Sequence, residues 1–363
     1  MEQATVGNVS VNIGAITNSK QMVQDAHNVA DENVKAVKRV QGAMTAISTI
    51  SLAGITAAGV ALLGSARAAI VFEDSFAGIR KTVEASEEQF GRLATSIKEI
   101  ASVAPMSSTE LNRIGELGGQ LGVAVSNLPD FIKTVSTLAV TTNLTVDGAS
   151  LGLARLDAIA QTNGETFQNL ASTIVDLGNN FAATESEIMT TVLRIAQAAA
   201  QVGATTQDAL AFATALQAIG VPAQAGGTAV ARVFQSIQSA LIQAQGETTE
   251  FGRIAAQSGQ VAADGFDELF GEDPAKAVQF FIEGLNQLNS SGDDVISRLE
   301  RLGLSQRRTT LAILGLAEAG DLVNRTLDTA RTAFDENSAA TEEALKKYGT
   351  LASQIQITKN IFN

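Results

Sequence analysis

Residues 185–241 read ESEIMTTVLRIAQAAAQVGATTQDALAFATALQAIGVPAQAGGTAVARVFQSIQSAL. Apolar side chains recur there in steps of three and four over three consecutive segments, and this spacing places them on one face of an α-helix. The joints between the segments are short and contain glycine. Helices joined in this way pack antiparallel or cross at steep angles, so the stretch predicts three helices in close succession.

Capping residues mark the ends of these helices. Thr184–Glu187 and Thr205–Asp208 each have the spacing of a capping box, in which two side chains accept hydrogen bonds from each other's backbone. Gly203 and Gly220 follow the first two segments. They predict helix ends, because glycine readily adopts the left-handed conformation that ends many helices.

Short motifs in and around this stretch resemble the core domain of phage tail tape measure proteins. The motifs consist of helix caps and small residues, and their order and spacing together carry the resemblance. They are GATTQDALA at 203–211, AIGV at 218–221, AGGTA at 225–229 and RLERLGL at 298–304. The resemblance extends from Phe72-Glu73 to about Phe362, which is most of the chain.

The resemblance implies a structural protein of the phage virion. Such a protein sets tail length, occupies the lumen of the tail tube and is ejected toward the host envelope with the DNA. The expected partners are further copies of the chain, the tail tube, tail tip and tail assembly chaperone proteins, and the host membrane on ejection. Assembly is expected in the host cytoplasm. A protein that sets tail length as a molecular ruler must be long. A fully helical chain of this length would reach only about 540 Å, at about 1.5 Å per residue, so we expect a fragment, a processed form or a split variant of such a ruler.

The composition restricts the core and its chemistry. Hydrophobic residues make up 45% of the 363 residues, whereas aromatic residues make up 4% and Trp is absent, so we expect a core of Ala, Val, Leu and Ile. The absence of Cys excludes disulfides and cysteine zinc sites. The single His27 has no second His or Cys to complete a metal site, and no spacing isolates a nucleophile with its base. We therefore expect no enzyme, no cofactor and no metal.

The charge argues against binding of nucleic acid. The formal net charge is -13, and the basic residues form pairs but no longer run. Binding to a phosphate backbone requires clustered Lys and Arg, so no specific nucleic-acid binding is expected. An acidic surface would let nucleic acid pass without adhering, and it is equally compatible with ordinary solubility.

An apolar stripe follows the predicted helix from about Lys20. Its steps of three and four predict a coiled-coil or bundle seam, and a polar Asn within such a seam can fix register and oligomeric state. An ordinary amphipathic helix packed on its own chain is the alternative. The stripe consists of Val23, Ala26, Ala30, Asn33, Val37, Val40, Met44 and Ile47.

Residues 42–66 carry no charged side chain. The run is long enough to cross a bilayer, but its Ser and Thr residues dilute its apolar character, so burial within a bundle or oligomer is favoured. The alternative function is a membrane-inserting or pore-forming helical protein that acts through this segment. A face suited to close packing, or to a membrane, consists of Ala53, Gly54, Ala57, Gly59 and Gly64.

A second seam is predicted near the C-terminal end of the sequence. The polar stretch at 335–338 interrupts the helical pattern, and a final helix follows from about Thr341. Its apolar stripe has the same spacing as the first one and is therefore also a candidate oligomer seam. The stripe consists of Leu345, Tyr348, Ala352 and Ile355.

The predicted fold class is all-α. We expect an N-terminal tail and an elongated helix in residues 1–70, a multi-helix core in residues 71–334 and the start of a long coiled-coil-like helix in residues 335–363, assembled in a helical oligomer. A helical adaptor module is a third alternative, suggested by the Ala, Thr, Gln and Glu content of the helices alone.

Overall fold

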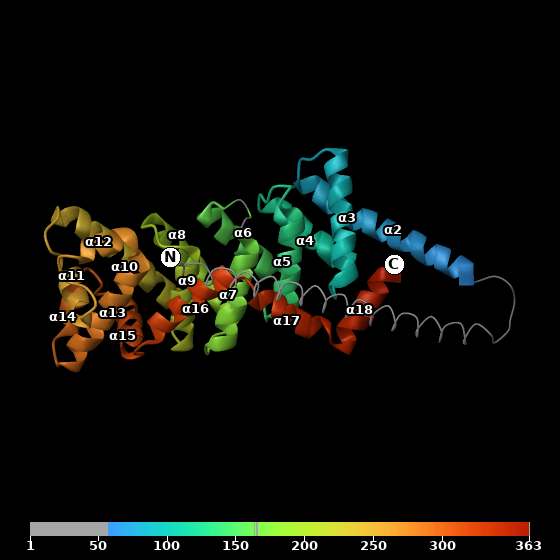
Figure 1. Ribbon diagram of the computed structural model, residues 1–363. Coiled ribbons are helices and arrows are strands. Elements are labelled where there is room, and N and C mark those ends of the chain that lie inside the picture. Colours follow the sequence, from blue (N-terminus) through green and yellow to red (C-terminus); the bar gives the residue numbers. More distant parts are fainter. Residues whose placement is uncertain (1–56, 163, 165, 363) are drawn as a thin grey trace, which may run out of the picture. The chain divides into compact units, whose positions relative to one another are not determined.

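The computed structural model describes residues 57–162, 164 and 166–362. These residues form α-helices, one short 3-10 helix and no strand, which confirms the all-α prediction. The chain divides into two compact units, Met1–Gly64 and Ser65–Asn363. The helix α2 (Ala57–Thr82) begins in the first unit and ends in the second. Helices α3 to α18 all lie in the second unit (Figure 1).

The second unit contains two consecutive series of helices. The outgoing series is α3 (Glu87–Val103), α4 (Ser108–Gln120), α5 (Leu128–Thr141), α6 (Val146–Ala160), α7 (Phe167–Asn180), α8 (Glu185–Gln201), α9 (Thr206–Ala218), α10 (Ala223–Ala244), α11 (Glu250–Ala255), η1 (Ala256–Ser258), α12 (Phe266–Glu272), α13 (Pro274–Ser290) and α14 (Val295–Arg301). The return series is α15 (Arg307–Glu318), α16 (Leu322–Glu336), α17 (Ala339–Tyr348) and α18 (Leu351–Phe362).

The return series contacts progressively earlier helices of the outgoing series (Figure 1). The helix α15 packs against α10 and α13, α16 against α9 and α7, α17 against α7 and α5, and α18 against α3. Residues far apart in the sequence are therefore brought together along the whole unit. This arrangement determines which polar residues meet.

Phenylalanine contributes more to the core than its frequency suggests. The expectation of a core built from Ala, Val, Leu and Ile was incomplete, because the largest fully buried side chains are Phe131, Phe167, Phe212, Phe234, Phe251, Phe266 and Phe281. Several of them form edge-on pairs across neighbouring helices; Phe212 on α9 and Phe234 on α10 have ring centroids 5.7 Å apart at an interplanar angle of 89°. Such pairs add attraction beyond the area they bury.

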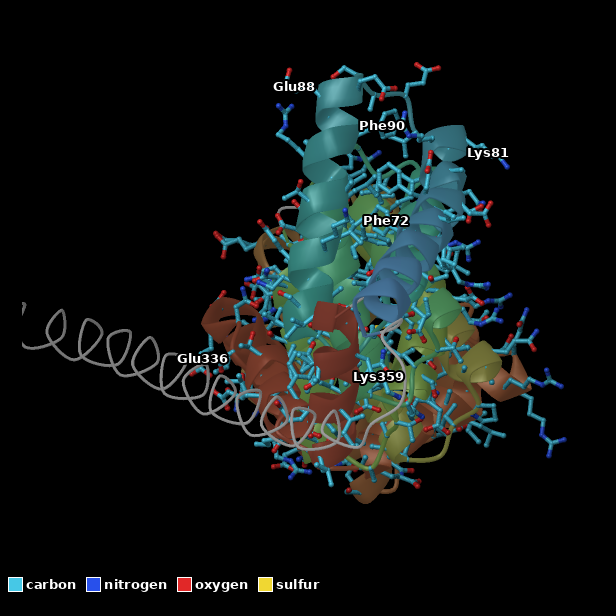
Figure 2. The ribbon with its side chains drawn as sticks, turned by 90° about the vertical axis from the view of Figure 1, so that its right-hand side faces the viewer. Phe72, Lys81, Glu88, Phe90, Glu336 and Lys359 are labelled. Atoms are coloured by element: carbon cyan, nitrogen blue, oxygen red, sulfur yellow. The ribbon has the colours of Figure 1, made fainter. Side chains whose placement is uncertain are left out.

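Phenylalanines also join α2 to α3. Figure 2 shows Phe72 and Phe90 in the space between these two helices. The Phe76 ring contacts both, at centroid distances of 5.6 Å from Phe72 and 6.1 Å from Phe90. The guanidinium carbon of Arg80 lies 4.6 Å from the Phe90 ring centroid, within range of a cation–π contact. Phe72, where the resemblance begins, thus belongs to the aromatic cluster between the two helices.

The stretch between Phe251 and Pro274 contains α11, η1 and α12, and its described residues include no strand. The C-terminal end of the chain differs from the sequence expectation. The predicted long C-terminal helix is divided, because Gly349 and Thr350 separate α17 from α18. Both pieces pack back onto the unit, so an unbroken C-terminal helix was wrong.

The N-terminal stripe lies outside the described residues, as do Ala53 and Gly54 of the close-packing face. Ala57, Gly59 and Gly64 belong to α2. Within the described part of the chain, no helix is both long enough and apolar enough to cross a membrane.

Candidate assembly interface

The three helices α8, α9 and α10 are joined as their capping residues predict. The Thr184 backbone N–H and hydroxyl donate to Glu187 Oε2 at 3.0 and 2.7 Å, and the Glu187 N–H donates to the Thr184 hydroxyl. The bonds from the Thr184 hydroxyl and, to a smaller extent, from its backbone N–H lower the pKa of the Glu187 carboxylate. Gly203 and Gly220 follow the ends of α8 and α9 with φ of 87° and 73°, the left-handed region that glycine tolerates best.

The AGGTA motif brings α10 close to its neighbours. A Cβ atom at Gly227 would lie 2.8 Å from Arg194 Cβ and 3.2 Å from the carbonyl oxygen of Thr191, both on α8. A Cβ atom at Gly226 would lie 2.9 Å from a methyl group of Leu216 on α9. The two glycines are therefore required by the short distance between helices, and the motif encodes packing rather than chemistry.

Arg331 on α16 connects the starts of two other helices. Its Nε donates to Asp208 Oδ1 at 2.8 Å, while Nη1 and Nη2 donate to the two carboxylate oxygens of Asp273 at 2.9 and 2.8 Å. Asp208 belongs to the capping box of α9 and accepts the Thr205 backbone N–H at 3.1 Å. Asp273 caps α13 by accepting the Lys276 backbone N–H at 3.0 Å. We call Arg331, Asp208 and Asp273 the arginine node.

The arginine node is partly removed from solvent. The Asp208 side chain is 4% exposed, Asp273 28% and Arg331 38%. Burial alone would raise the pKa of Asp273, but hydrogen bonds from Arg331 and from the Lys276 backbone outweigh it and lower that pKa. The two carboxylates raise the pKa of Arg331. The node therefore holds charged groups that fix the return series on α9 and α13.

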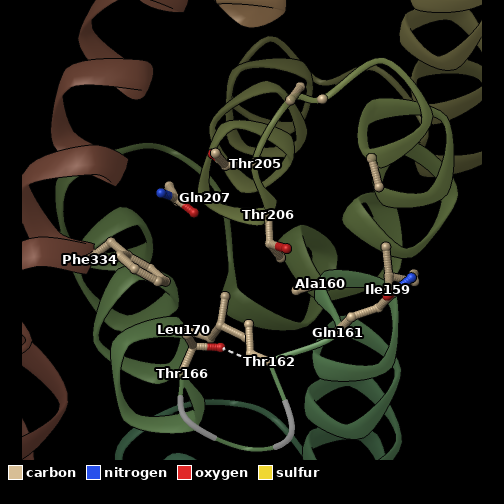
Figure 3. Close-up of a pocket in the computed structure, with 13 residues that line it drawn as sticks. Ile159, Ala160, Gln161, Thr162, Thr166, Leu170, Thr205, Thr206, Gln207 and Phe334 are labelled. Atoms are coloured by element: carbon tan, nitrogen blue, oxygen red, sulfur yellow. Dashed lines mark hydrogen bonds between the residues drawn. The ribbon is translucent and has the colours of Figure 1, made fainter.

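A cavity of about 460 Å³ opens beside the GATTQDALA motif (Figure 3). Thr205, Thr206 and Gln207 at the start of α9 face Phe334 of α16 across it, and Thr162 and Thr166 lie at its base. The hydroxyl oxygens of Thr162 and Thr166 are 2.9 Å apart. None of the described lining residues is charged, so they offer hydroxyl and amide groups for hydrogen bonding only. Among the described residues, no group of three His, Cys, Asp or Glu is arranged to hold a metal ion.

The C-terminal stripe lies on α17 and α18. Leu345, Ala352 and Ile355 are exposed, with Leu345 at 62% and Ile355 at 48%. Tyr348 is half-buried, and burial raises the pKa of its hydroxyl. Most of the predicted seam is therefore available for contact with another molecule. Whether it joins copies of the chain stays a prediction.

The comparison with protein families agrees with the helical motifs. Residues 94–272 match the family model described as phage-related minor tail protein. The minor tail protein match begins within α3 and ends with α12, so it includes α8, α9 and α10 with their caps and the AGGTA motif. It indicates a structural role in a phage tail and a location in the virion tail. No curated protein and no solved structure matches the chain.

The match and the sequence reasoning differ in two respects. The match covers a shorter part of the chain than the resemblance, which extended from Phe72 to about Phe362. The sequence also gave no indication of the arginine node. Asp208 belongs to a capping box that the sequence predicts, but nothing in the sequence connects Asp208 or Asp273 to Arg331, which is 123 residues from Asp208 and 58 from Asp273.

Proposed function

We propose that the chain is a tape measure protein, or a part of one, that sets the length of a phage tail. In this proposal it occupies the tail tube lumen during assembly and leaves with the DNA toward the host envelope. The match of residues 94–272 to phage-related minor tail proteins is the observation that carries the proposal. The resemblance of its helical motifs to the tape measure core supports the more specific role of setting tail length.

The charge and chemistry of the chain support a structural role in that location. A net charge of -13 disfavours adhesion to DNA that must pass through the same tube. The proposed partners are further copies of this chain, through the exposed stripe on α17 and α18, and the tail tube, tail tip and tail assembly chaperone proteins. Catalysis and a cofactor have no part in the proposal.

A duplication of residues 20–47 tests the ruler directly. The segment is a whole number of heptads, so duplication preserves the phase of its apolar stripe. If it runs as a helix along the tube, tails should lengthen by about 42 Å, at about 1.5 Å per residue. Tail length is measured by negative-stain electron microscopy, and mass spectrometry confirms that the longer chain is in the particles.

The controls separate a tail role from a ruler role. Gly91→Ala, an exposed change on α3, should leave tail length unchanged. Tails of unchanged length that contain the duplicated chain would refute the ruler but not the tail location. Particles that contain no copy of the chain, whole or processed, would refute both.

A second candidate is action on a membrane through residues 42–66. The observation that favours it is on α2, where the adjacent residues Ile70 and Val71 are 66% and 46% exposed. If this candidate holds, the purified chain should release dye from liposomes, and Gly59→Lys should abolish the release. Absence of release by the unaltered chain would eliminate it.

A further inference from the structure

The last two helices are held by few buried side chains. Among the described side chains, α17 buries Ala340 and Ala344, and α18 buries Ile357. The preceding helix α16 buries six, including Leu322, Val323 and Leu327. Hydrophobic stabilisation scales with buried apolar area, so α17 and α18 gain much less from packing than α16 does.

The surface beneath α17 is polar and incompletely filled. A cavity of about 40 Å³ lies between α17 and the α5–α7 pair, lined by Lys133, Thr134, Thr137, Gln168, Ala171, Ser172, Ala340 and Thr341. The Thr134 hydroxyl is buried and has no hydrogen-bond partner among the described residues. A buried hydroxyl without a partner costs free energy, and the cost is relieved when water reaches it.

Besides the buried Ile357, polar contacts attach α18. The Asn360 side-chain amide donates to carbonyl oxygens at the end of α3 and in the segment after it: Ala101 at 2.9 Å, Ala104 at 3.3 Å and Met106 at 2.6 Å. These carbonyls lack helical partners, so Asn360 caps α3 from a distant helix. Water can replace each of these bonds at small net cost once the helix moves away.

The connection to α16 permits such a movement. Asn337 ends α16 with a left-handed φ of 49°, and its side-chain oxygen accepts the Ser172 hydroxyl of α7 at 3.1 Å. Among the described ion pairs, the one within α17 is the local Lys346–Glu343 pair, and none joins α17 or α18 to the rest of the unit. By contrast, the arginine node holds α16.

We propose that residues 339–362 form a strap that detaches from the helical unit as one segment while α3 to α16 stay folded. The turn at Asn337 is the hinge, and the Asn360 contact with α3 is the main attachment. Release would present both faces of the strap, including the exposed Leu345, Leu351 and Ile355, without unfolding the motif region. This inference goes beyond the proposed function and does not depend on it.

Hydrogen exchange of the purified chain tests the strap. After correction for intrinsic rates, amides of α17 and α18 should exchange on the order of 100-fold faster than those of α16, because local opening requires less free energy than global unfolding. The two helices should show the same opening equilibrium. Protection of α17 and α18 equal to that of α16 would overturn the proposal.

Two neighbouring substitutions on α18 test the attachment. Asn360→Ala should speed exchange in α17 and α18 about five- to tenfold, the factor that corresponds to loss of one net hydrogen bond, and should leave α16 unchanged. Alanine also favours helix more than asparagine does, so faster exchange cannot come from lower helix propensity. Lys359→Ala is the matched control on the exposed side of the same helix, and it should not speed exchange. Equal effects of both substitutions, or none from Asn360→Ala, would contradict the role of Asn360.

Tyr348 offers an independent readout because it is the only Tyr of the chain and Trp is absent. Its fluorescence therefore reports on α17 alone. In a urea titration the Tyr348 signal should change at a lower concentration than the helical circular dichroism signal, since transitions of separate units do not coincide. Coincident transitions would refute an independently released strap. Tail length is measured on particles, so the strap and the proposed function can fail separately.

Discussion

Replacing Arg331 with Ala should destabilise the second unit more than the loss of a partly exposed side chain usually does. The substitution removes three charged hydrogen bonds, at 2.8, 2.9 and 2.8 Å, and leaves the nearly buried Asp208 without its cation. Hydrogen bonds to charged groups contribute about 1.5 kcal/mol each at the lower end, and solvent around Arg331 reduces the sum. We expect the free energy of unfolding to fall by about 3 kcal/mol.

The assay is urea denaturation followed by circular dichroism at the helical minimum, read as the midpoint at constant m-value. Arg325→Ala is the matched control on the same helix, because Arg325 is 59% exposed and its pair with Asp321 is longer, at 3.4 Å. The control should cost about 0.5 kcal/mol. A double-mutant cycle of Arg331→Ala with Asp273→Asn should show a coupling free energy of about 1–2 kcal/mol. If Arg331→Ala costs no more than Arg325→Ala, or if the coupling is zero, the node does not hold the return series.

The contribution of the Asp273–Arg331 ion pair to stability should decrease at acidic pH. The pKa of Asp273 is lower in the folded chain than in the unfolded chain. Its contribution to stability is therefore fully present above the unfolded pKa, about 3.9, and is lost as the pH falls through the lower folded value. The stability difference between the unaltered chain and Arg331→Ala should stay constant from about pH 5 to 8 and shrink below about pH 4. A difference that grows on acidification would contradict the assigned ion pair.

Two further predictions concern packing and assembly. Gly284→Ala should destabilise by about 3 kcal/mol, because the added Cβ would lie 1.9 Å from the carbonyl oxygen of Ile254 and the backbone would have to move. Gly91→Ala, where no described atom lies within 4 Å of the added Cβ, should instead stabilise α3 by about 0.5–1 kcal/mol, and thermal denaturation distinguishes the two. If the C-terminal stripe joins copies, Leu345→Glu should lower the mass measured by light scattering, whereas Leu311→Glu, equally exposed on α15, should not. Equal masses for all three proteins would eliminate that stripe as a seam.

The local features of the fold follow from the sequence. Apolar spacing located the helices, and the capping boxes predicted at Thr184–Glu187 and Thr205–Asp208 both form. Gly115 lets α4 pack closely on α2, since a Cβ there would lie 2.6 Å from the Ile79 side chain. These features depend on residues within one or two helical turns, or on the absence of a side chain. A single sequence contains that information.

The tertiary structure decided which helices meet. Nothing local brings Arg331 to Asp208 and Asp273, or Asn360 to the end of α3, because these contacts depend on the path that the return series takes back along the outgoing helices. The break at Gly349 and the burial of Tyr348 against α5 likewise follow from that path. Helical periodicity shows which side of a helix is apolar, but not which neighbour covers it. The sequence alone therefore determined the helices and their ends, while the fold determined the arginine node, the strap and the part of the C-terminal stripe that remains exposed.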